Sequence, residues 1–101
     1  MIFIYVPFQN AETAKTVGKL LVEKRMAGSV DVLPTRSYYR VNGEVAETSG
    51  ATIIVKTIDK HIQGVEDVVR EYYQDGIPCI ASLSLYRLNR DFKDWLINAT
   101  N

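Results

Sequence analysis

The dipeptide Asn42-Gly43 constrains the fold of this chain more than any other feature of the sequence. Both central positions of a type I′ hairpin turn need positive φ, which asparagine and glycine accept most readily. The sequence therefore predicts one strand from Ser29 to Val41 and its return from Glu44. At about 3.3 Å per residue the first strand would reach roughly 43 Å, whereas a compact domain of this length is roughly 33 Å across. We expect the hairpin tip to project beyond the body.

The outer part of this hairpin carries apolar side chains at Tyr38, Tyr39 and Val41. Apolar residues on a projecting ribbon are a liability for a monomer, because they invite pairing with other chains. We therefore predict that the ribbon pairs with another subunit and that these three residues belong to an oligomer interface. The alternative is a bend at Pro34 that folds the ribbon back over its own sheet. Since proline cannot donate to a ladder, Pro34 predicts an edge position or a bulge.

The first part of the chain predicts a strand followed by a helix. Residues Ile2–Pro7 are nearly all apolar, as expected for a central strand. Asn10 is a good N-cap for a helix that begins at Ala11. An apolar stripe continues to Ala27, and Gly28 follows where a C-cap glycine belongs.

The second half repeats this order after the hairpin. The returning strand passes a weak patch at Thr48-Ser49-Gly50 and becomes strongly apolar by Ile53. Asp59 is the predicted N-cap of a helix that ends near Tyr73. A strand is expected from about Pro78, and a short last helix from about Asp91, with an apolar face of Phe92, Trp95 and Leu96.

This element order indicates one α+β domain over residues 1–101. The order β-α-β-β-α-β is the split pattern of the ferredoxin-like fold, here with a short C-terminal helix. Such a fold has an antiparallel sheet with both long helices on one face.

The composition of the chain limits the kinds of partner that we expect it to have. The 101 residues carry no formal net charge, so we expect no nucleic-acid partner, which a basic excess would favour. No apolar run approaches the roughly 18 residues of a membrane span, and Met1–Phe8 lacks the basic region of a signal peptide. The single cysteine excludes an intrachain disulfide and fits a reducing compartment. We expect a cytoplasmic protein without a membrane partner.

Chemistry-bearing residues are few. His61 is the only histidine and is expected to be a solvated helix residue, since no cysteine or second histidine stands at metal-ligand spacing. Cys79 has two interpretations: a small buried hydrophobe, or a thiolate at a cleft. Three such thiolates, one per subunit, could hold a soft ion such as Cu(I). With no phosphate loop, nucleophile elbow or Cys–His pair, we expect no enzyme activity.

Several short motifs, in order, make the chain similar to a known family. They are Leu20–Ala27 (LLVEKRMA), Val30-Asp31, Ser37–Arg40 (SYYR), Asn42–Val45 (NGEV), Ile54–Thr57 (IVKT), Ile77-Pro78 and Asp94–Leu96 (DWL). In order and spacing the chain resembles the CutA divalent-cation tolerance proteins, small ferredoxin-like trimers. The resemblance implies a homotrimer with interlocking hairpins and clefts between subunits.

The same resemblance marks where this chain departs from the family. The position of the family's cysteine after the first helix is Ser29 here, and a His-Pro-Tyr motif is replaced by Tyr73, Gln74 and Asp75. Cys79 stands where a carboxylate is usual, and Val41 replaces a hairpin tryptophan. The implied site is a cleft containing Ser29, Lys56, Tyr73, Asp75 and Cys79, with Cys79 as the one remaining candidate metal ligand. A simpler interpretation of Asp75 is that it only forms part of an Asp-Gly turn.

Three functions follow as hypotheses. The first is a CutA-like homotrimer linked to tolerance of divalent cations such as copper, with its metal ligands partly lost. The second draws on the similar architecture of the PII signalling proteins: a small anionic effector bound between subunits, with Arg36 and Lys56 as its cations. The third is a trimeric scaffold that binds no ligand.

Overall fold

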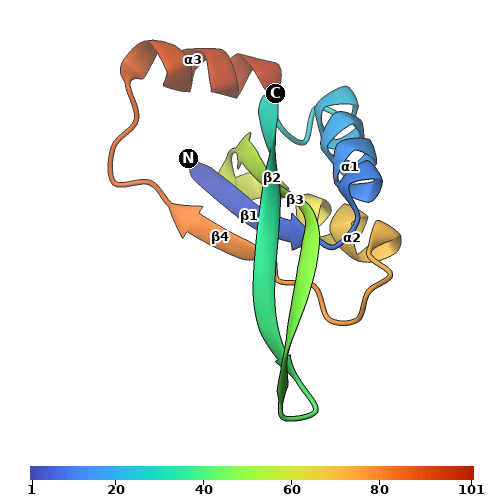
Figure 1. The fold of residues 1–101 in the computed structure, drawn as a ribbon. Coiled ribbons are helices and arrows are strands. Elements are labelled where there is room, and N and C mark those ends of the chain that lie inside the picture. The colour runs from blue at the N-terminus through green and yellow to red at the C-terminus, as the bar shows by residue number, and fades with distance from the viewer.

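The computed structural model describes residues 1–101 and contains one antiparallel sheet with the strand order β2-β3-β1-β4 (Figure 1). The elements follow the chain as β1 (Ile2–Phe8), α1 (Ala11–Glu23), β2 (Ser29–Val41), β3 (Glu44–Thr57), the 3₁₀ helix η1 (Asp59–His61), α2 (Ile62–Tyr72), β4 (Ala81–Ser84) and α3 (Arg90–Ala99). This confirms the predicted ferredoxin-like α+β fold. None of the helices reaches the length and apolarity that crossing a membrane requires.

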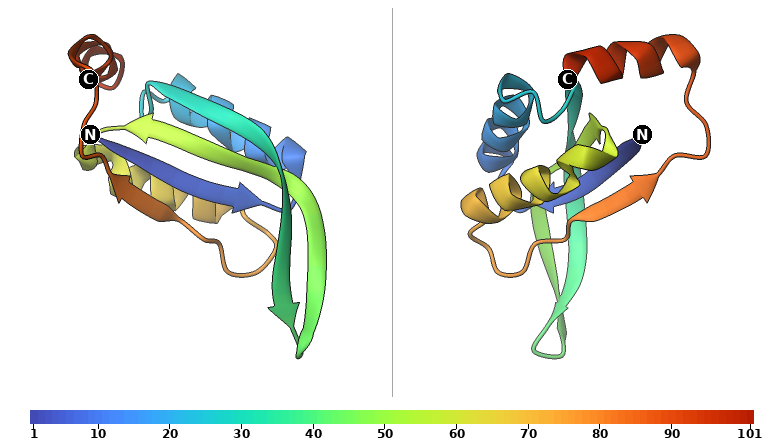
Figure 2. Two further views of the ribbon diagram at one scale, coloured as in Figure 1. Left: turned by 60° about the vertical axis from the view of Figure 1, so that its left-hand side comes forward. Right: turned by 180° about the vertical axis from the view of Figure 1, so that it is seen from behind.

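The core lies between the sheet and the helices α1 and α2, which cover the same face (Figure 2). Alternate residues of β1 point into this layer and are buried, whereas Phe3, Tyr5 and Pro7 point to the opposite face. Matching residues of β3, the helices and the loop after α1 complete the core: Ala51, Ile53, Val55, Ala14, Val17, Leu21, Ala27, Val65, Val68 and Val69. Helix α3 lies across one end of the sheet (Figure 1), so most of the second face is uncovered within the chain.

The β2–β3 hairpin is paired without interruption, from Ser29 opposite Lys56 to Val41 opposite Glu44. The predicted edge position of Pro34 is confirmed, since β2 is an outer strand and no ladder bond is needed on the outer side of the proline. The turn has positive φ at Asn42 and Gly43, as predicted. The ribbon projects beyond the body and does not fold back over the sheet (Figures 1 and 2), and the molecule measures 46 × 26 × 21 Å.

Two predicted helix boundaries are wrong. The α1 helix ends at Glu23, since Arg25 takes the left-handed conformation at φ 60° and turns the chain before Gly28 is reached. The Arg25 side chain then donates to the carbonyls of Asn98 (3.0 Å) and Asn101 (3.2 Å), which ties the end of α1 to the end of α3. Asp59 lies inside η1 and caps no helix; its carboxylate lies 3.4 Å from the Met1 amine.

The last strand is shorter than predicted. β4 begins at Ala81, so Cys79 lies in the preceding loop with its thiol exposed, and its interpretation as a buried hydrophobe is wrong.

The predicted N-cap of α1 is confirmed. The side-chain oxygen of Asn10 accepts from the backbone N–H groups of Glu12 (2.8 Å) and Thr13 (3.2 Å).

Gly50 fixes the point where the hairpin leaves the sheet. It pairs with Thr35 on β2, one residue past the last β1 pair, and a Cβ at this position would collide with the Phe8 carbonyl oxygen. We expect Gly50→Ala to lower the free energy of unfolding by about 3 kcal/mol or more, because backbone atoms must move to make room. Urea unfolding followed by circular dichroism measures this.

The matched control is Gly64→Ala in α2. A Cβ there would meet only the flexible end of Met26, at 3.3 Å from Cε. Alanine is also favoured over glycine in a helix by up to about 1 kcal/mol. Equal losses of stability in the two variants would contradict a specific requirement for glycine at position 50.

Candidate functional site

A cavity of about 330 Å³ opens where β1 ends, beside the base of the hairpin and the loop that follows α2. The loop contributes Tyr73, Asp75 and Cys79, and the hairpin contributes Tyr39 and Thr48 to its wall. The fold thus brings three of the five predicted site residues together. For Tyr39 the sequence predicted only a place in an oligomer interface. Ser37 and Tyr39 are two residues apart, so they lie on the same face of β2, and this spacing could have placed Tyr39 at the cavity.

The wall of this cavity is aromatic on one side and polar on the other. The rings of Phe8 and Tyr73 lie 5.6 Å apart between centroids, and the Tyr39 hydroxyl is 2.8 Å from the Thr48 hydroxyl. Ile77 is almost fully exposed at the rim. Asp75 is the only charged residue among those that line the cavity, so the cavity favours a cation or a positively charged group.

Tyr73 is the residue of this cavity whose acidity the fold changes most clearly. Burial raises the pKa of its phenol above the usual value, and the negative charges that Asp75, Cys79 and Tyr39 can carry raise it further. Tyr73 is therefore a neutral hydrogen-bond donor throughout the physiological range.

The other two predicted site residues, Ser29 and Lys56, lie opposite each other at the far end of the β2–β3 ladder. The Lys56 ammonium is 2.9 Å from the Asp31 carboxylate and lies over the rings of Phe3 (5.8 Å) and Phe92 (5.9 Å). The ion pair gives this lysine, which stands in an apolar strand, a partner for its charge. Asp31 was not predicted as the partner of Lys56, although it stands two residues after Ser29 and so shares its face of the strand.

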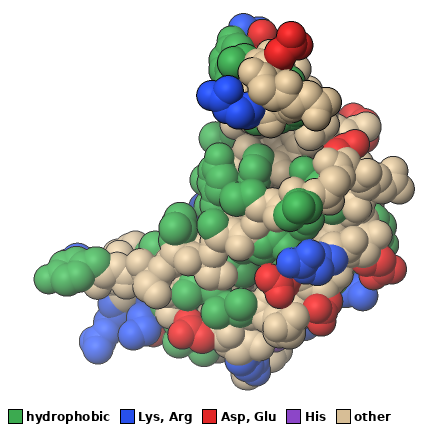
Figure 3. Space-filling view, turned by 90° about the horizontal axis from the view of Figure 1, so that it is seen from below, with side chains coloured by type: hydrophobic (Ala, Val, Ile, Leu, Met, Phe, Trp, Pro, Cys, Tyr) green, Lys and Arg blue, Asp and Glu red, His purple; other side chains and the backbone are tan.

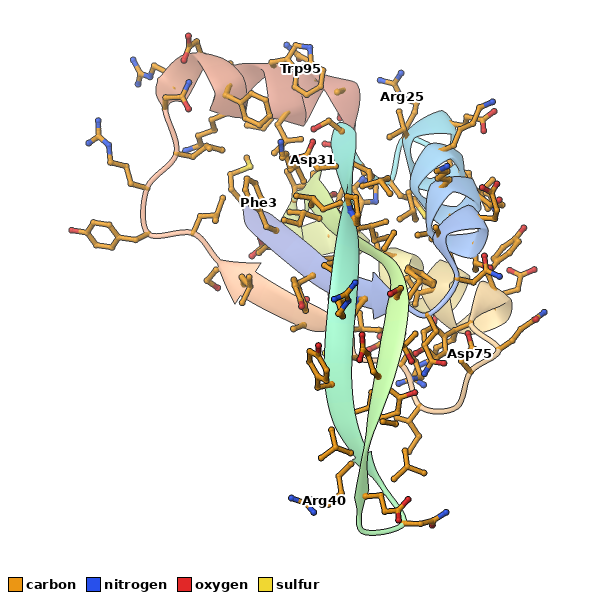
Figure 4. All side chains as sticks on the ribbon, in the orientation of Figure 1. Phe3, Arg25, Asp31, Arg40, Asp75 and Trp95 are labelled. Carbon is orange, nitrogen blue, oxygen red and sulfur yellow. The ribbon has the colours of Figure 1, made fainter.

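The five predicted residues therefore form two groups within one chain. Lys56 stands six positions along β3 from Gly50 at the cavity wall, which corresponds to roughly 20 Å. Figure 4 shows Asp31 beside the first group and Asp75 in the second, at opposite ends of the sheet. A site that uses both groups would need a second copy of the chain.

The predicted interface residues do not share one face of the ribbon. Because strand residues alternate, Tyr38 points to the opposite side from Tyr39 and Val41. All three remain exposed within the chain, Tyr38 most of all. Both sides of the hairpin are therefore free to make contacts.

Metal-ligating side chains are dispersed. Nowhere in the chain do three histidine, cysteine, aspartate or glutamate side chains come together. His61 is not a free solvated side chain, as its Nε2 lies 2.8 Å from the Thr100 carbonyl oxygen at the end of α3. Cys79 and Asp75 alone offer ligands at the cavity, so a complete metal site there would need more than one chain.

Two buried hydroxyls near the end of the sheet lead to opposite expectations. The Ser29 hydroxyl is buried with no hydrogen-bond partner in the chain, whereas the Thr57 hydroxyl donates to the Met26 carbonyl at 2.6 Å. Removing an unpartnered buried hydroxyl relieves a cost of about 1–3 kcal/mol. We expect Ser29→Ala to raise the free energy of unfolding and Thr57→Val to lower it by about 1 kcal/mol, both measured by urea titration. A large loss of stability in Ser29→Ala would mean that this hydroxyl has a partner on another chain.

The raised pKa of Tyr73 predicts how stability depends on pH. The unfolded chain releases a tyrosine proton near pH 10, whereas the folded protein holds the Tyr73 proton to higher pH. The folded state then binds more protons, so this contribution is complete below about pH 10 and is lost as pH rises further. We expect Tyr73→Phe to lose less unfolding free energy between about pH 9 and pH 11 than the wild type does. Tyr72→Phe, which removes a phenol at the end of α2 that does not line the cavity, is the control, and an equal response in both variants would contradict the prediction.

Comparison with known proteins adds to this geometry. The family model described as "CutA1 divalent ion tolerance protein" matches residues 2–99. The divalent-cation tolerance protein CutA of Thermus thermophilus is 34% identical over 97 residues, covering 95% of this chain and 92% of that protein. The CutA of Archaeoglobus fulgidus is 30% identical over 94 residues, covering 93% of this chain and 92% of that protein.

Solved structures agree with the sequence matches. The A. fulgidus structure, named as a periplasmic divalent cation tolerance protein CutA, superposes with a TM-score of 0.94 at 28% identity and covers 100% of both chains. The Pyrococcus horikoshii CutA1 structure gives a TM-score of 0.92 at 27% identity, covering 100% of this chain and 99% of that one. The family model spans nearly the whole chain, and the full fold superposes on these relatives, so the chain belongs to the CutA1 divalent ion tolerance protein family.

Proposed function

We propose that residues 1–101 form one CutA-like domain that assembles into a homotrimer and functions in the tolerance of divalent cations. We propose copper as the metal that it binds. The observation that carries the metal role is that the exposed Cys79 thiol and the Asp75 carboxylate line one cavity, which contains no cationic residue. A thiolate favours soft ions such as Cu(I). Because one chain offers too few ligands, the ion would be held between subunits.

Assembly is supported by the uncovered face of the sheet. Tyr5 of the central strand β1 is 40% exposed there, and Leu33 and Leu83 of the edge strands β2 and β4 are 41% and 51% exposed. Seen from below, hydrophobic side chains lie exposed in patches between charged ones (Figure 3). Apolar surface of this kind, together with the free edge of β2, marks an interaction surface.

Binding is favoured over catalysis by the position of the possible catalytic groups. His61 contacts the end of α3, whereas Cys79 lines the cavity at the other end of the sheet. A thiol without a histidine in reach lacks the Cys–His arrangement of nucleophilic enzymes. We therefore propose that the protein is not an enzyme.

A PII-like anion site receives less support from the geometry. Both of its candidate cations already face carboxylates, Lys56 on Asp31 at 2.9 Å and Arg36 on Glu47 at 3.2 Å. A small anion would have to displace a carboxylate from either one. The ligand-free scaffold stays as the remaining alternative, which metal titration separates from the leading proposal.

The cytoplasm is the compartment we propose, because it keeps a single exposed thiol reduced. The A. fulgidus relative is named as periplasmic. Cell fractionation of the protein in its own host tests this point, and recovery in an extracytoplasmic fraction would overturn it.

Native mass spectrometry of the freshly reduced protein, with and without Cu(I), tests the proposal. We expect a trimer that takes up copper in a fixed ratio, and we expect Cys79→Ser to abolish the uptake because it removes the only thiolate. The control is Ser82→Ala in β4, which leaves the thiol in place. A trimer that stays metal-free would overturn the copper role and leave the scaffold, and a monomer would overturn the assembly.

A further inference from the structure

Tyr86 is the one aromatic side chain that nothing in the chain covers. It is fully exposed on the irregular segment of residues 85–89, which we call the arm and which connects β4 to α3 at the outside of the molecule (Figure 1). An exposed tyrosine loses little conformational entropy when its large ring is buried, because its side chain has only two rotatable torsions. Tyrosine is also among the residues that most often anchor an interface.

The cavity beside Tyr73 has the properties of a receptor for such a ring. Its volume of about 330 Å³ lies at the small end of the range for ligand pockets, about 300–1,000 Å³, so it suits one side chain or a small ligand. Phe8 and Ile77 supply apolar contacts, and the Asp75 carboxylate can accept from a phenol. The residue after Tyr86 is Arg87, whose charge complements Asp75.

The arm and the cavity of one chain are far apart. The arm begins at the end of β4, which lies beside Ile2, and a second hollow is lined by Met1 together with residues of the arm. The cavity lies past Phe8, at the other end of β1, which is roughly 20 Å away along the strand. Figure 4 shows the same separation, with Asp75 on the side of the molecule opposite the arm. The ring of Tyr86 therefore needs a second copy of the chain.

We propose that Tyr86 of one copy fills the cavity lined by Tyr73, Asp75 and Cys79 of the next copy, and that Arg87 faces Asp75 across this contact. Each copy gives one arm and receives one, through two different surfaces. Such a head-to-tail contact closes into a ring when the rotation between copies is right. Each cavity is then completed by the arm of its neighbour. The arm and a metal ion would compete for the cavity, so the contact rests on the trimer proposed above and not on the proposed copper site.

Cross-linking tests the contact directly. In Tyr86→Cys the new thiol is expected to lie close to the Cys79 thiol of the adjacent copy, so a short bis-maleimide reagent should produce covalent dimers and trimers on denaturing gels. The same reagent should leave Lys19→Cys, on the exposed side of α1, uncross-linked. Adding Cys79→Ser to Tyr86→Cys should abolish the product.

Two substitutions at position 86 measure the strength of the contact. We expect Tyr86→Ser to raise the apparent dissociation constant of the trimer at least about 30-fold, the loss typical of an interface hot spot, and Tyr86→Phe to keep most of the affinity. Analytical ultracentrifugation over a concentration series provides the constants. A stable trimer that neither cross-links through position 86 nor weakens in Tyr86→Ser would overturn this contact and leave the proposed trimer standing. A wild-type monomer would overturn both.

Discussion

The antiparallel pairing of β3 with two neighbours supports every other part of this molecule. β3 is paired with β2 from Lys56 to Glu44, and with β1 from Thr57 to Ala51. Its register places Ile53 and Val55 on the side of the helices together with the buried residues of β1. Slipping by one residue would exchange the two faces of the strand and expose the core. The pairing of β3 with β1 ends at Ala51, so the hairpin continues without β1 from Gly50, which lines the cavity.

The cavity exists because three segments end or turn at one place. β1 ends at Phe8, the loop after α2 returns from Tyr73, and the hairpin passes between them at Gly50. Each segment supplies a different chemistry: an aromatic wall, a carboxylate with a thiol, and paired hydroxyls. Asp75 has no cation beside it among the lining residues, so the cavity favours positive charge. Family membership, the open sheet face and this charge all support the proposal of an assembly that binds a cation or cationic groups between its copies.

Much of the fold followed from local patterns, whereas the site did so only in part. The Asn42-Gly43 turn, the Asn10 cap and the alternation in β1 are short-range signals, and each predicted its element correctly. The end of α1 was wrong because the left-handed turn fell on Arg25, whose side chain is held by α3 far along the chain. Cys79 was placed in a strand because its periodicity continues that of β4. The distance between Lys56 and the cavity could not be predicted from neighbouring residues in the sequence, and neither could the full exposure of Tyr86. Both depend on which strand ends lie together in the fold.

The central position of β1 also affects how the chain is completed during synthesis. β1 is made first, yet its neighbours are β3, whose last paired residue is Thr57, and β4, which pairs Ser84 with Ile2. The apolar segment around Ile4 therefore leaves the ribosome with no strand to join. At about 5–20 residues per second this wait lasts several seconds, during which the β2–β3 hairpin can close by itself within microseconds. The hairpin is then a ready template for the waiting strand, and a nascent chain halted before residue 84 would display one edge of β1 to chaperones.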